Sequence, residues 1–373
     1  MNEINDLIEL CHFFGKSDAW ALAGGGNISE KHGDCIAIKK SGVRLKDITS
    51  KDNFVFLNLQ AHSIFDLYKK KPSDPESFYQ KLISRILNGQ AFRPSIELAF
   101  HVLGCKFTAH THPTVVNVFS CAIEGREMLI KKFGSTTDLA CVNYHKPGII
   151  LTLAMIDELG LSRRKTLPTV TVLLNHGLIV TADTPEDVKK KSFDFIKKID
   201  SDLPDMPVDQ HKKISPSKSE ATLTSVISKL SNGKLKPFFI TSPFLRDNSE
   251  DFLIDGVIGS GTIYPDAVVY NGKAPLLLEN ATSESNISDG IFKFIDFHQH
   301  FPKIVFMDGV FYTISHSQVE SKDMEDIFLN HTKIIFLIKK MGWSPKFLSE
   351  HQVNEIANWD AERYRQKIAL ETI

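Results

Sequence analysis

The sequence predicts an α/β protein with two domains. Between residues 3 and 200, runs rich in β-branched and aromatic residues alternate with segments of helical periodicity, which is typical of α/β folds. Residues 206–218 then form a polar, proline-containing stretch with the composition of a linker, and a second α/β pattern follows it. A length of 373 residues suits two hydrophobic cores better than one. We therefore expect one domain at 1–205 and another at 219–373.

In the first half, helical and strand patterns are read from periodicity and from their end signals. The short helix expected at 93–104 has Pro94 near its first turn and Gly104 just past its end. The last helix of this half opens with Thr184-Pro185 and an acidic first turn. Helices are expected at 3–20, 73–89, 93–104, 114–125 and 184–199, and strands at 35–42, 53–59, 106–114 and 169–177.

The second half gives a weaker but similar pattern. Asp308-Gly309 lies between two apolar runs, so residues 303–315 are expected to form a β-hairpin. The last part of the chain holds two helical patterns. Further helices are expected at 221–233 and 287–301, and strands at 236–241, 266–270 and 275–279.

Composition excludes several classes of protein. The chain has 44 Lys+Arg against 45 Asp+Glu, so it lacks the basic excess of a nucleic-acid-binding protein. No apolar run approaches the ~18 residues of a membrane-spanning helix, and the first residues do not resemble a signal peptide. The five cysteines form no CxxC pair. We expect reduced thiols and a cytoplasmic protein with no membrane partner.

Three histidines stand at the ends of two expected strands. His110 and His112 are two residues apart, so a strand places both imidazoles on one face, and Pro113 ends the strand there. His176 ends another apolar run, and Gly177 allows close backbone approach. Three imidazoles with an open fourth position are the arrangement of catalytic zinc. On spacing alone, however, a His-x-His pair is more often accidental than ligating.

Five motifs, in this order, resemble those of the class II (zinc-dependent) sugar-phosphate aldolases of the aldolase/adducin family. They are AGGGNIS, IKKSG, PSIELAFHVLG, AHTHPT and LLNHGLIV, and they span about residues 5–200. The resemblance implies a three-layer α/β/α domain, followed here by a smaller α/β domain.

The subfamily it resembles most is the aldolase portion of bifunctional rhamnulose-phosphate aldolase/dehydrogenase proteins. The HTHP motif, GTIYPDAVVYNGKAPLLL and WDAERYRQKIA are similar to sequences of that portion. The Rossmann dehydrogenase is missing: the glycine-rich run at 256–262 lacks GxGxxG spacing and is followed by Tyr264-Pro265. We therefore expect no dehydrogenase in the second half.

The resemblance also implies roles for individual residues. It makes His110, His112 and His176 the ligands of one zinc, or another divalent metal, per chain, and Glu97 the catalytic carboxylate. Without it, we would favour an ordinary first-turn helix acid stabilised by the dipole. His101, four residues further on, is expected to be a satisfied core histidine. Five residues match the turns that cradle the substrate phosphate and the hydroxyl before the catalytic acid: Gly26, Asn27, Ser41, Gly42 and Ser95.

The implied activity is that of an aldolase (a lyase) that cleaves or forms the C3–C4 bond of a ketose 1-phosphate through a metal-stabilised enediolate. A sugar-phosphate epimerase or dehydratase on the same zinc site is an alternative, although epimerases of the family carry Asp at the position of Glu97. A non-catalytic adducin-like binding protein is another, but adducins lack the metal histidines. The family also implies a homo-oligomer.

Overall fold

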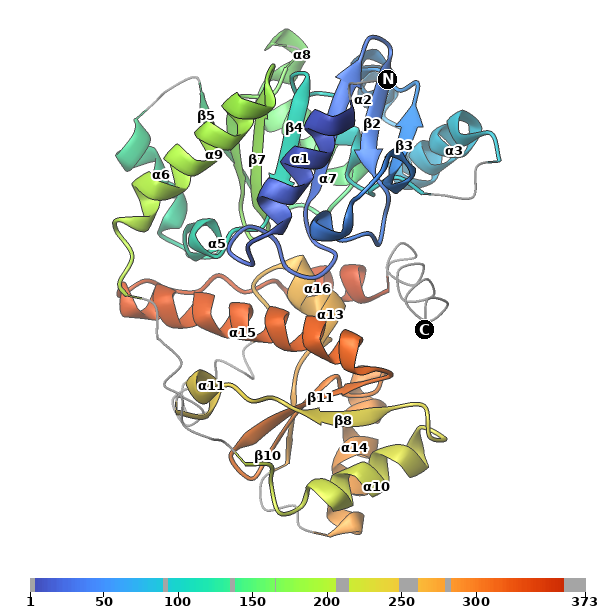
Figure 1. Cartoon of the computed structure of the whole chain (residues 1–373), viewed down its shortest axis with the longest axis vertical. Helices are drawn as coiled ribbons and strands as arrows, with labels where there is room; N and C mark the ends of the chain where they lie inside the picture. Colours follow the sequence, from blue (N-terminus) through green and yellow to red (C-terminus); the bar gives the residue numbers. More distant parts are fainter. Residues whose placement is uncertain are drawn as a thin grey trace. The chain divides into compact units, whose positions relative to one another are not determined.

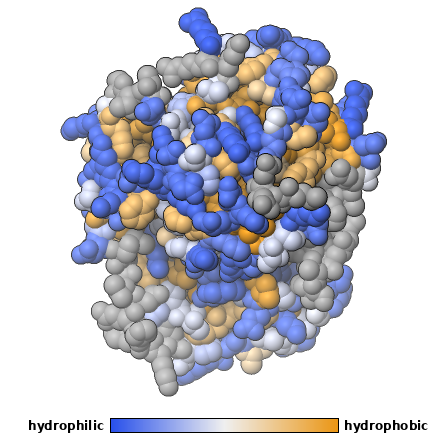
Figure 2. Space-filling view, turned by 45° about the horizontal axis from the view of Figure 1, so that its top comes forward, coloured by the Kyte–Doolittle hydropathy of each residue, from blue (hydrophilic) through white to orange (hydrophobic). Residues whose placement is uncertain are grey.

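The computed structural model describes residues 4–89, 93–134, 138–164, 166–205, 215–247, 261–278 and 283–358. The chain divides into two compact units, of which the first ends at Leu203 and the second is Pro204–Asn358 (Figure 1). Hydrophilic residues predominate on the face drawn in Figure 2, with apolar patches between them. None of the described helices is both long enough and apolar enough to cross a bilayer.

The first unit is built on a seven-stranded sheet with the order β3-β2-β1-β4-β7-β6-β5. All neighbouring strands are antiparallel except β5 and β6. The central pair of ladders matters most for the site, because β4 pairs with β1 on one side and with β7 on the other. The strands are β1 (Asn27–His32), β2 (Cys35–Lys39), β3 (Phe54–Leu57), β4 (Phe107–Thr111), β5 (Leu139–Val142), β6 (Val170–Leu173) and β7 (Gly177–Ala182).

Helices cover both faces of this sheet, so the first unit is the expected three-layer α/β/α domain (Figure 1). One face is covered by α1 (Ile4–Gly15), α5 (Thr114–Ser120) and α9 (Pro185–Asp200), with α6 (Gly125–Phe133) beside α5. The other face packs on α2 (Ala61–Lys70), α3 (Pro75–Leu87), α4 (Leu98–His101), α7 (Ile149–Glu158) and α8 (Leu161–Arg164).

End signals in the sequence account for the bounds of the longer helices. The Asp74 carboxylate accepts a hydrogen bond from the Ser77 N–H at the start of α3, and Asn88 ends that helix in the left-handed region at φ 45°. The Thr184 hydroxyl caps α9 in the same way by accepting from the Asp187 N–H. Both helices begin with proline, as the sequence indicates.

The expected helix at 93–104 is much shorter than its pattern indicates. The structure restricts it to α4, Leu98–His101, with Glu97 as the N-cap. Pro94 instead forms a β-bridge with Lys40, and the Ser95 N–H donates to the Lys39 carbonyl at 3.2 Å. Pairing with the end of β2 therefore holds this stretch extended, and it fixes where Glu97 enters the helix.

The second unit is the smaller α/β domain, with a four-stranded sheet of order β8-β11-β10-β9. Asp308 and Gly309 connect β10 and β11 with φ of 51° and 81°, so the expected hairpin is confirmed. Helices α10 and α14 pack on one face, whereas α15 and α13 lie on the other side. The elements are α10 (Glu220–Leu230), β8 (Lys236–Phe239), α11 (Pro243–Asp247), α13 (Pro265–Asn271), β9 (Leu276–Leu278), α14 (Glu284–His298), β10 (Ile304–Met307), β11 (Val310–Ser315), α15 (Gln318–Lys340) and α16 (Glu350–Ala357).

The strand expected at 266–270 is wrong, because these residues lie in helix α13. Tyr264 is the N-cap, Pro265 stands at the first position, and Gly272 ends the helix with φ 79°. This helix packs against α15, and its Val268 and Val269 are buried. Tertiary burial and end signals thus override the strand propensity of the two valines. Most of the glycine-rich run at 256–262, and the sequence from 359 onward, lie outside the described residues.

His331 on α15 predicts an acid-dependent loss of stability. Its side chain is buried against Tyr264, its Nε2 has no hydrogen-bond partner among the described residues, and burial lowers its pKa to about 4. Between pH 4 and the ordinary value near 6.5, the unfolded chain binds more protons than the folded chain. The free energy of unfolding is therefore unaffected by His331 protonation above pH 6.5. As the pH falls from 6.5 to 4, protonation of His331 in the unfolded chain lowers it by about 3 kcal/mol.

Denaturant unfolding of the wild type and of His331→Met between pH 4 and pH 7.5 measures this effect. The free energy of unfolding of the wild type should fall relative to the variant below pH 6.5, because methionine takes up no proton. Parallel curves over the whole range would show that His331 does not contribute.

Candidate metal centre and active site

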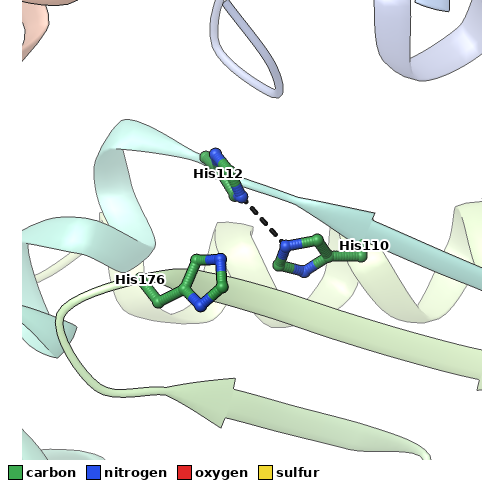
Figure 3. A group of neighbouring side chains, drawn as sticks. All are labelled: His110, His112 and His176. Carbon is green, nitrogen blue, oxygen red and sulfur yellow. Dashed lines mark hydrogen bonds between the residues drawn. The ribbon is translucent and has the colours of Figure 1, made fainter. Parts of the chain in front are cut away.

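The sheet brings the three histidines together at one end of β4. His110 is the fourth residue of β4, His112 follows the strand, and His176 lies in the turn between β6 and β7. In the ladder between β4 and β7, His110 stands opposite Ile179, so the end of β4 meets this turn. Figure 3 shows the three rings directed toward one another from these two segments. Their ligand atoms all lie within 4.8 Å of one another.

The ring of His110 is oriented for ligation. Its Nδ1–H donates to the Leu178 carbonyl at 3.0 Å, since a carbonyl oxygen can only accept. Nε2 is then the nitrogen without a proton in the neutral ring, and it lies 2.9 Å from Nε2 of His112. Burial, and next the neighbouring imidazoles, lower the pKa of His110, against the opposite effect of Glu97. A neutral imidazole with one nitrogen anchored on a carbonyl is the usual state of a metal ligand.

Glu97 lies beside this group with its carboxylate almost fully buried. Oε2 is 3.2 Å from His110 Nε2, and Oε1 is 3.2 Å from His176 Nε2. Burial raises the pKa of the carboxyl, but the positive charge that His110 and His176 can carry lowers it well below the usual range. An ionised carboxylate here therefore needs positive charge among the imidazoles, supplied by protons or by a cation.

The residues present fit a divalent cation. Two polar atoms of the site, Oε1 of Glu97 and Nδ1 of His176, are buried. Neither forms a hydrogen bond of ordinary geometry with the described residues. Within those residues, the three histidines form the one group of at least three His, Cys, Asp or Glu side chains with ligand atoms this close. Three imidazoles are also a known ligand set for zinc. Three imidazoles that converge beside the Glu97 carboxylate therefore agree with the expected metal site.

The residues expected at the substrate phosphate lie in two turns and one extended segment near Glu97. Gly26 has φ 72°, and a Cβ there would lie 3.1 Å from the His110 carbonyl, so glycine suits this position. The Ser41 N–H donates to the Arg93 carbonyl at 3.0 Å, which places the Ser41-Gly42 turn beside the segment that leads to Ser95. The Ser95 hydroxyl in turn accepts a hydrogen bond from the Glu97 N–H at 3.3 Å.

Asn27 has an additional contact that the sequence did not indicate. It stands opposite His110 in the ladder between β1 and β4, and its side-chain Nδ2 donates to Glu97 Oε2 at 2.9 Å. The side chain thus lies on the catalytic candidate itself. Its role at a phosphate stays a proposal.

Lys39 and His101 are two further residues whose contacts bear on the site. Lys39 is buried, and its Nζ donates to the carbonyls of Gly24 and Val43 at 3.4 and 2.5 Å, which ties the two turns together. His101 is fully buried and hydrogen-bonded at both ring nitrogens, as expected for a satisfied core histidine. The side-by-side lysines in the IKKSG motif were the available signal for Lys39.

The backbone at Gly177 is packed so closely against the site that a side chain does not fit there. A Cβ at this position would lie 2.5 Å from the Thr111 carbonyl oxygen and 2.7 Å from Cδ2 of His112. Gly177→Ala should therefore displace the His112 ring, weaken zinc binding and destabilise the fold by ~1–3 kcal/mol, as overpacking does.

Zinc titration and thermal unfolding of the variant check this prediction. Gly290→Ala is the control, because its Cβ would meet only the Leu278 side chain, at 2.5 Å, in the second unit. The control should bind zinc like the wild type. Unchanged zinc affinity in Gly177→Ala would contradict the packing described above.

Comparison with known proteins agrees with this reading at the level of the family. Residues 5–195 match the Class II Aldolase and Adducin N-terminal domain family, so the chain belongs to that family. No curated protein sequence matches it.

Solved structures similar to this chain include three that each cover about half of it. The N-terminal class II aldolase domain of a conserved Thermoplasma acidophilum protein is 20% identical, with a TM-score of 0.44 over 53% of this chain and 92% of that one. A sugar-phosphate aldolase from Thermotoga maritima is 12% identical, with a TM-score of 0.36 over 53% and 92%. An L-fuculose-1-phosphate aldolase from Thermus thermophilus is 15% identical, with a TM-score of 0.32 over 54% and 92%.

Proposed function

We propose that the protein is a zinc-dependent aldolase that cleaves or forms the C3–C4 bond of a ketose 1-phosphate. One observation supports this function above others: three imidazoles converge beside a buried carboxylate in a chain of the class II aldolase and adducin family. A protein that only bound a partner would need neither the three ligands nor the buried acid.

His110, His112 and His176 would hold the metal, with a fourth position open for substrate. When bound there, a divalent cation supplies positive charge for the oxyanion that forms as the C3–C4 bond breaks. The imidazole of His110 is held for this purpose by the Leu178 carbonyl.

Glu97 would move the proton. Cleavage breaks the C3–C4 bond, leaves the electron pair on the three-carbon fragment and releases an aldehyde. Overall, one proton leaves the C4 hydroxyl and one is added to C3, and we assign the delivery at C3 to the Glu97 carboxyl. Its burial and its position 3.2 Å from two imidazoles suit a general acid–base that works in a water-poor site.

The two turns would receive the phosphate of the substrate. Backbone N–H groups of glycine turns bind anions without a charged side chain. The buried Lys39 adds positive charge beneath both turns and holds them in place. We assign this role to Gly26, Asn27, Ser41, Gly42 and Ser95.

The organisation of the whole chain follows the same proposal. Residues 1–205 would be the catalytic domain, 206–218 a linker and 219–373 a C-terminal domain without dehydrogenase activity. This arrangement is similar to the aldolase portion of the rhamnulose-phosphate proteins, and a cytoplasmic homo-oligomer remains our expectation.

A screen of ketose 1-phosphates for aldehyde release tests the proposed function, with the full chain, added zinc, and a chelator in parallel. Zinc-dependent release of an aldehyde together with dihydroxyacetone phosphate is the expected result. Conversion to an epimer or a dehydrated sugar, with no carbon–carbon cleavage, would favour the alternative enzymes of the family and contradict an aldolase.

A further inference from the structure

One face of strand β1 presents a row of polar side chains to the segment that contains Glu97. Asn27, Ser29 and Lys31 alternate along the strand, so they share a face. Their partners are Glu97, His101 and the carbonyl of Gly104, in the same order. Two residues of a strand advance ~6.8 Å, and the four residues from Glu97 to His101 advance ~6 Å in a helix, so Asn27 and Ser29 stay opposite these two residues.

The direction of each hydrogen bond in this row is fixed by its neighbour. Nδ2 of Asn27 donates to Glu97 Oε2 at 2.9 Å, because a carboxylate can only accept. The Asn27 Oδ1 then faces Nε2 of His101, which must donate to it. Nδ1 of His101 is left to accept, and the Ser29 hydroxyl donates to it at 2.7 Å.

A neutral His101 is the form that this chain of bonds requires. The ring is fully buried, and burial lowers its pKa to about 3. A neutral ring has one donor and one acceptor nitrogen, which matches the partners on its two sides. A protonated ring would donate at both nitrogens and would force the Ser29 hydroxyl to turn away.

The two carboxylate oxygens of Glu97 are not equivalent as a result. Oε2 accepts the Asn27 hydrogen bond and lies 3.2 Å from His110 Nε2. Oε1 likewise lies 3.2 Å from an imidazole, Nε2 of His176, but it accepts no hydrogen bond of ordinary geometry from the described residues, although it is buried. The row of hydrogen bonds thus holds Oε2, and Oε1 is the oxygen left available to react.

We propose that Ser29 and His101 are positioning residues that act through Asn27 to hold Glu97 Oε2, so that Oε1 is the oxygen that exchanges the proton with C3 of the substrate. In that step the C3–H bond of dihydroxyacetone phosphate breaks, its electron pair stays on the three-carbon fragment, and the proton bonds to Oε1. The reverse step returns it. The proposal rests on the proposed function for its chemistry, but the hydrogen-bond chain can be tested without turnover.

Nitrogen NMR of the metal-free full chain, labelled with ¹⁵N-histidine, tests the chain of hydrogen bonds directly. At pH 7 the His101 signals, identified by their loss in His101→Gln, should be those of the neutral tautomer with the proton on Nε2. A proton on Nδ1, or a doubly protonated ring, would overturn the proposal. Because this NMR measurement needs no substrate, its result is valid even if the wild type cleaves no ketose 1-phosphate.

Two matched pairs of variants then test the consequence for turnover. His101→Gln keeps a donor for Asn27, whereas His101→Met has a similar volume and no donor. Ser29→Ala removes the outer hydroxyl of the row. Thr108→Val removes a hydroxyl at the position directly opposite Ser29, where Thr108 is bonded to Thr181 instead.

We expect His101→Met to lower kcat by about tenfold, the worth of one buried hydrogen bond, with KM within twofold of the wild type. His101→Gln should lose clearly less, Ser29→Ala should lower kcat several-fold, and Thr108→Val should keep the wild-type kcat. All variants should retain bound zinc.

Wild-type kcat in a zinc-loaded His101→Met would overturn the proposal. An equal loss in His101→Gln, His101→Met and Thr108→Val would also overturn it, because packing alone would then explain the effect. If Glu97→Gln turns over at the wild-type rate, the proposed role of Glu97 fails, and the NMR result still decides whether His101 orients Asn27.

Discussion

Glu97→Gln should lower the turnover number for ketose 1-phosphate cleavage by roughly 10²–10⁴-fold, the range that general acid–base catalysis supplies. Glutamine keeps the volume of the side chain, and its amide oxygen can still accept the hydrogen bond from Asn27. The amide cannot take up and return a proton at C3. Steady-state rates with saturating zinc and substrate measure the loss.

The fold and the metal should survive this change. Three imidazoles suffice to hold zinc, and the loss of one charge at a helix N-terminus costs only about 0.3–1 kcal/mol. Glu158→Gln is the control, because Glu158 also pairs with a histidine, His145, at 2.7 Å, but we give it no part in the reaction. Wild-type turnover in a zinc-loaded Glu97→Gln would make Glu97 a structural acid.

His112→Ala should lose most of its bound metal and nearly all activity. The wild type should contain about one divalent ion per chain, and two imidazoles with no third hold a catalytic zinc poorly. Elemental analysis after dialysis gives the metal content directly. The double variant His112→Ala/His176→Ala should contain none.

The second H-x-H pair of the chain provides the control for this experiment. His298 ends α14 and His300 follows it, and neither belongs to the three-histidine group. His298→Ala/His300→Ala should therefore keep its metal. Full metal occupancy in the His112→Ala/His176→Ala variant would refute the assignment of the ligands.

The sequence predicted those parts of the fold that local chemistry determines. Pro75, Asp74 and Thr184 set helix starts, and Asp308-Gly309 set a hairpin, because caps and turns need particular residues. The pattern failed at 266–270, where burial against α15 outweighed strand propensity. It also failed at Pro94, which a long-range bridge to Lys40 holds out of the helix.

Part of the site was also predicted, because local sequence determines where its strands end. His110, His112 and His176 stand at strand ends that their own sequences reveal, and the structure brings them together. The contact between Asn27 and Glu97, which are 70 residues apart in the chain, was not visible, since it depends on β1 pairing with β4. Strand β1 holds Ser29, Glu30 and Lys31, and this polar composition gave no strand signal.

The most direct test of the account is proton exchange at C3 of dihydroxyacetone phosphate, which requires no knowledge of the aldehyde. The full chain with one zinc is incubated with this compound in D₂O, and deuterium at C3 is followed by NMR. We predict exchange that depends on zinc and falls by at least ~10² in Glu97→Gln. No exchange by the zinc-loaded wild type, or equal exchange by Glu97→Gln, would contradict the account.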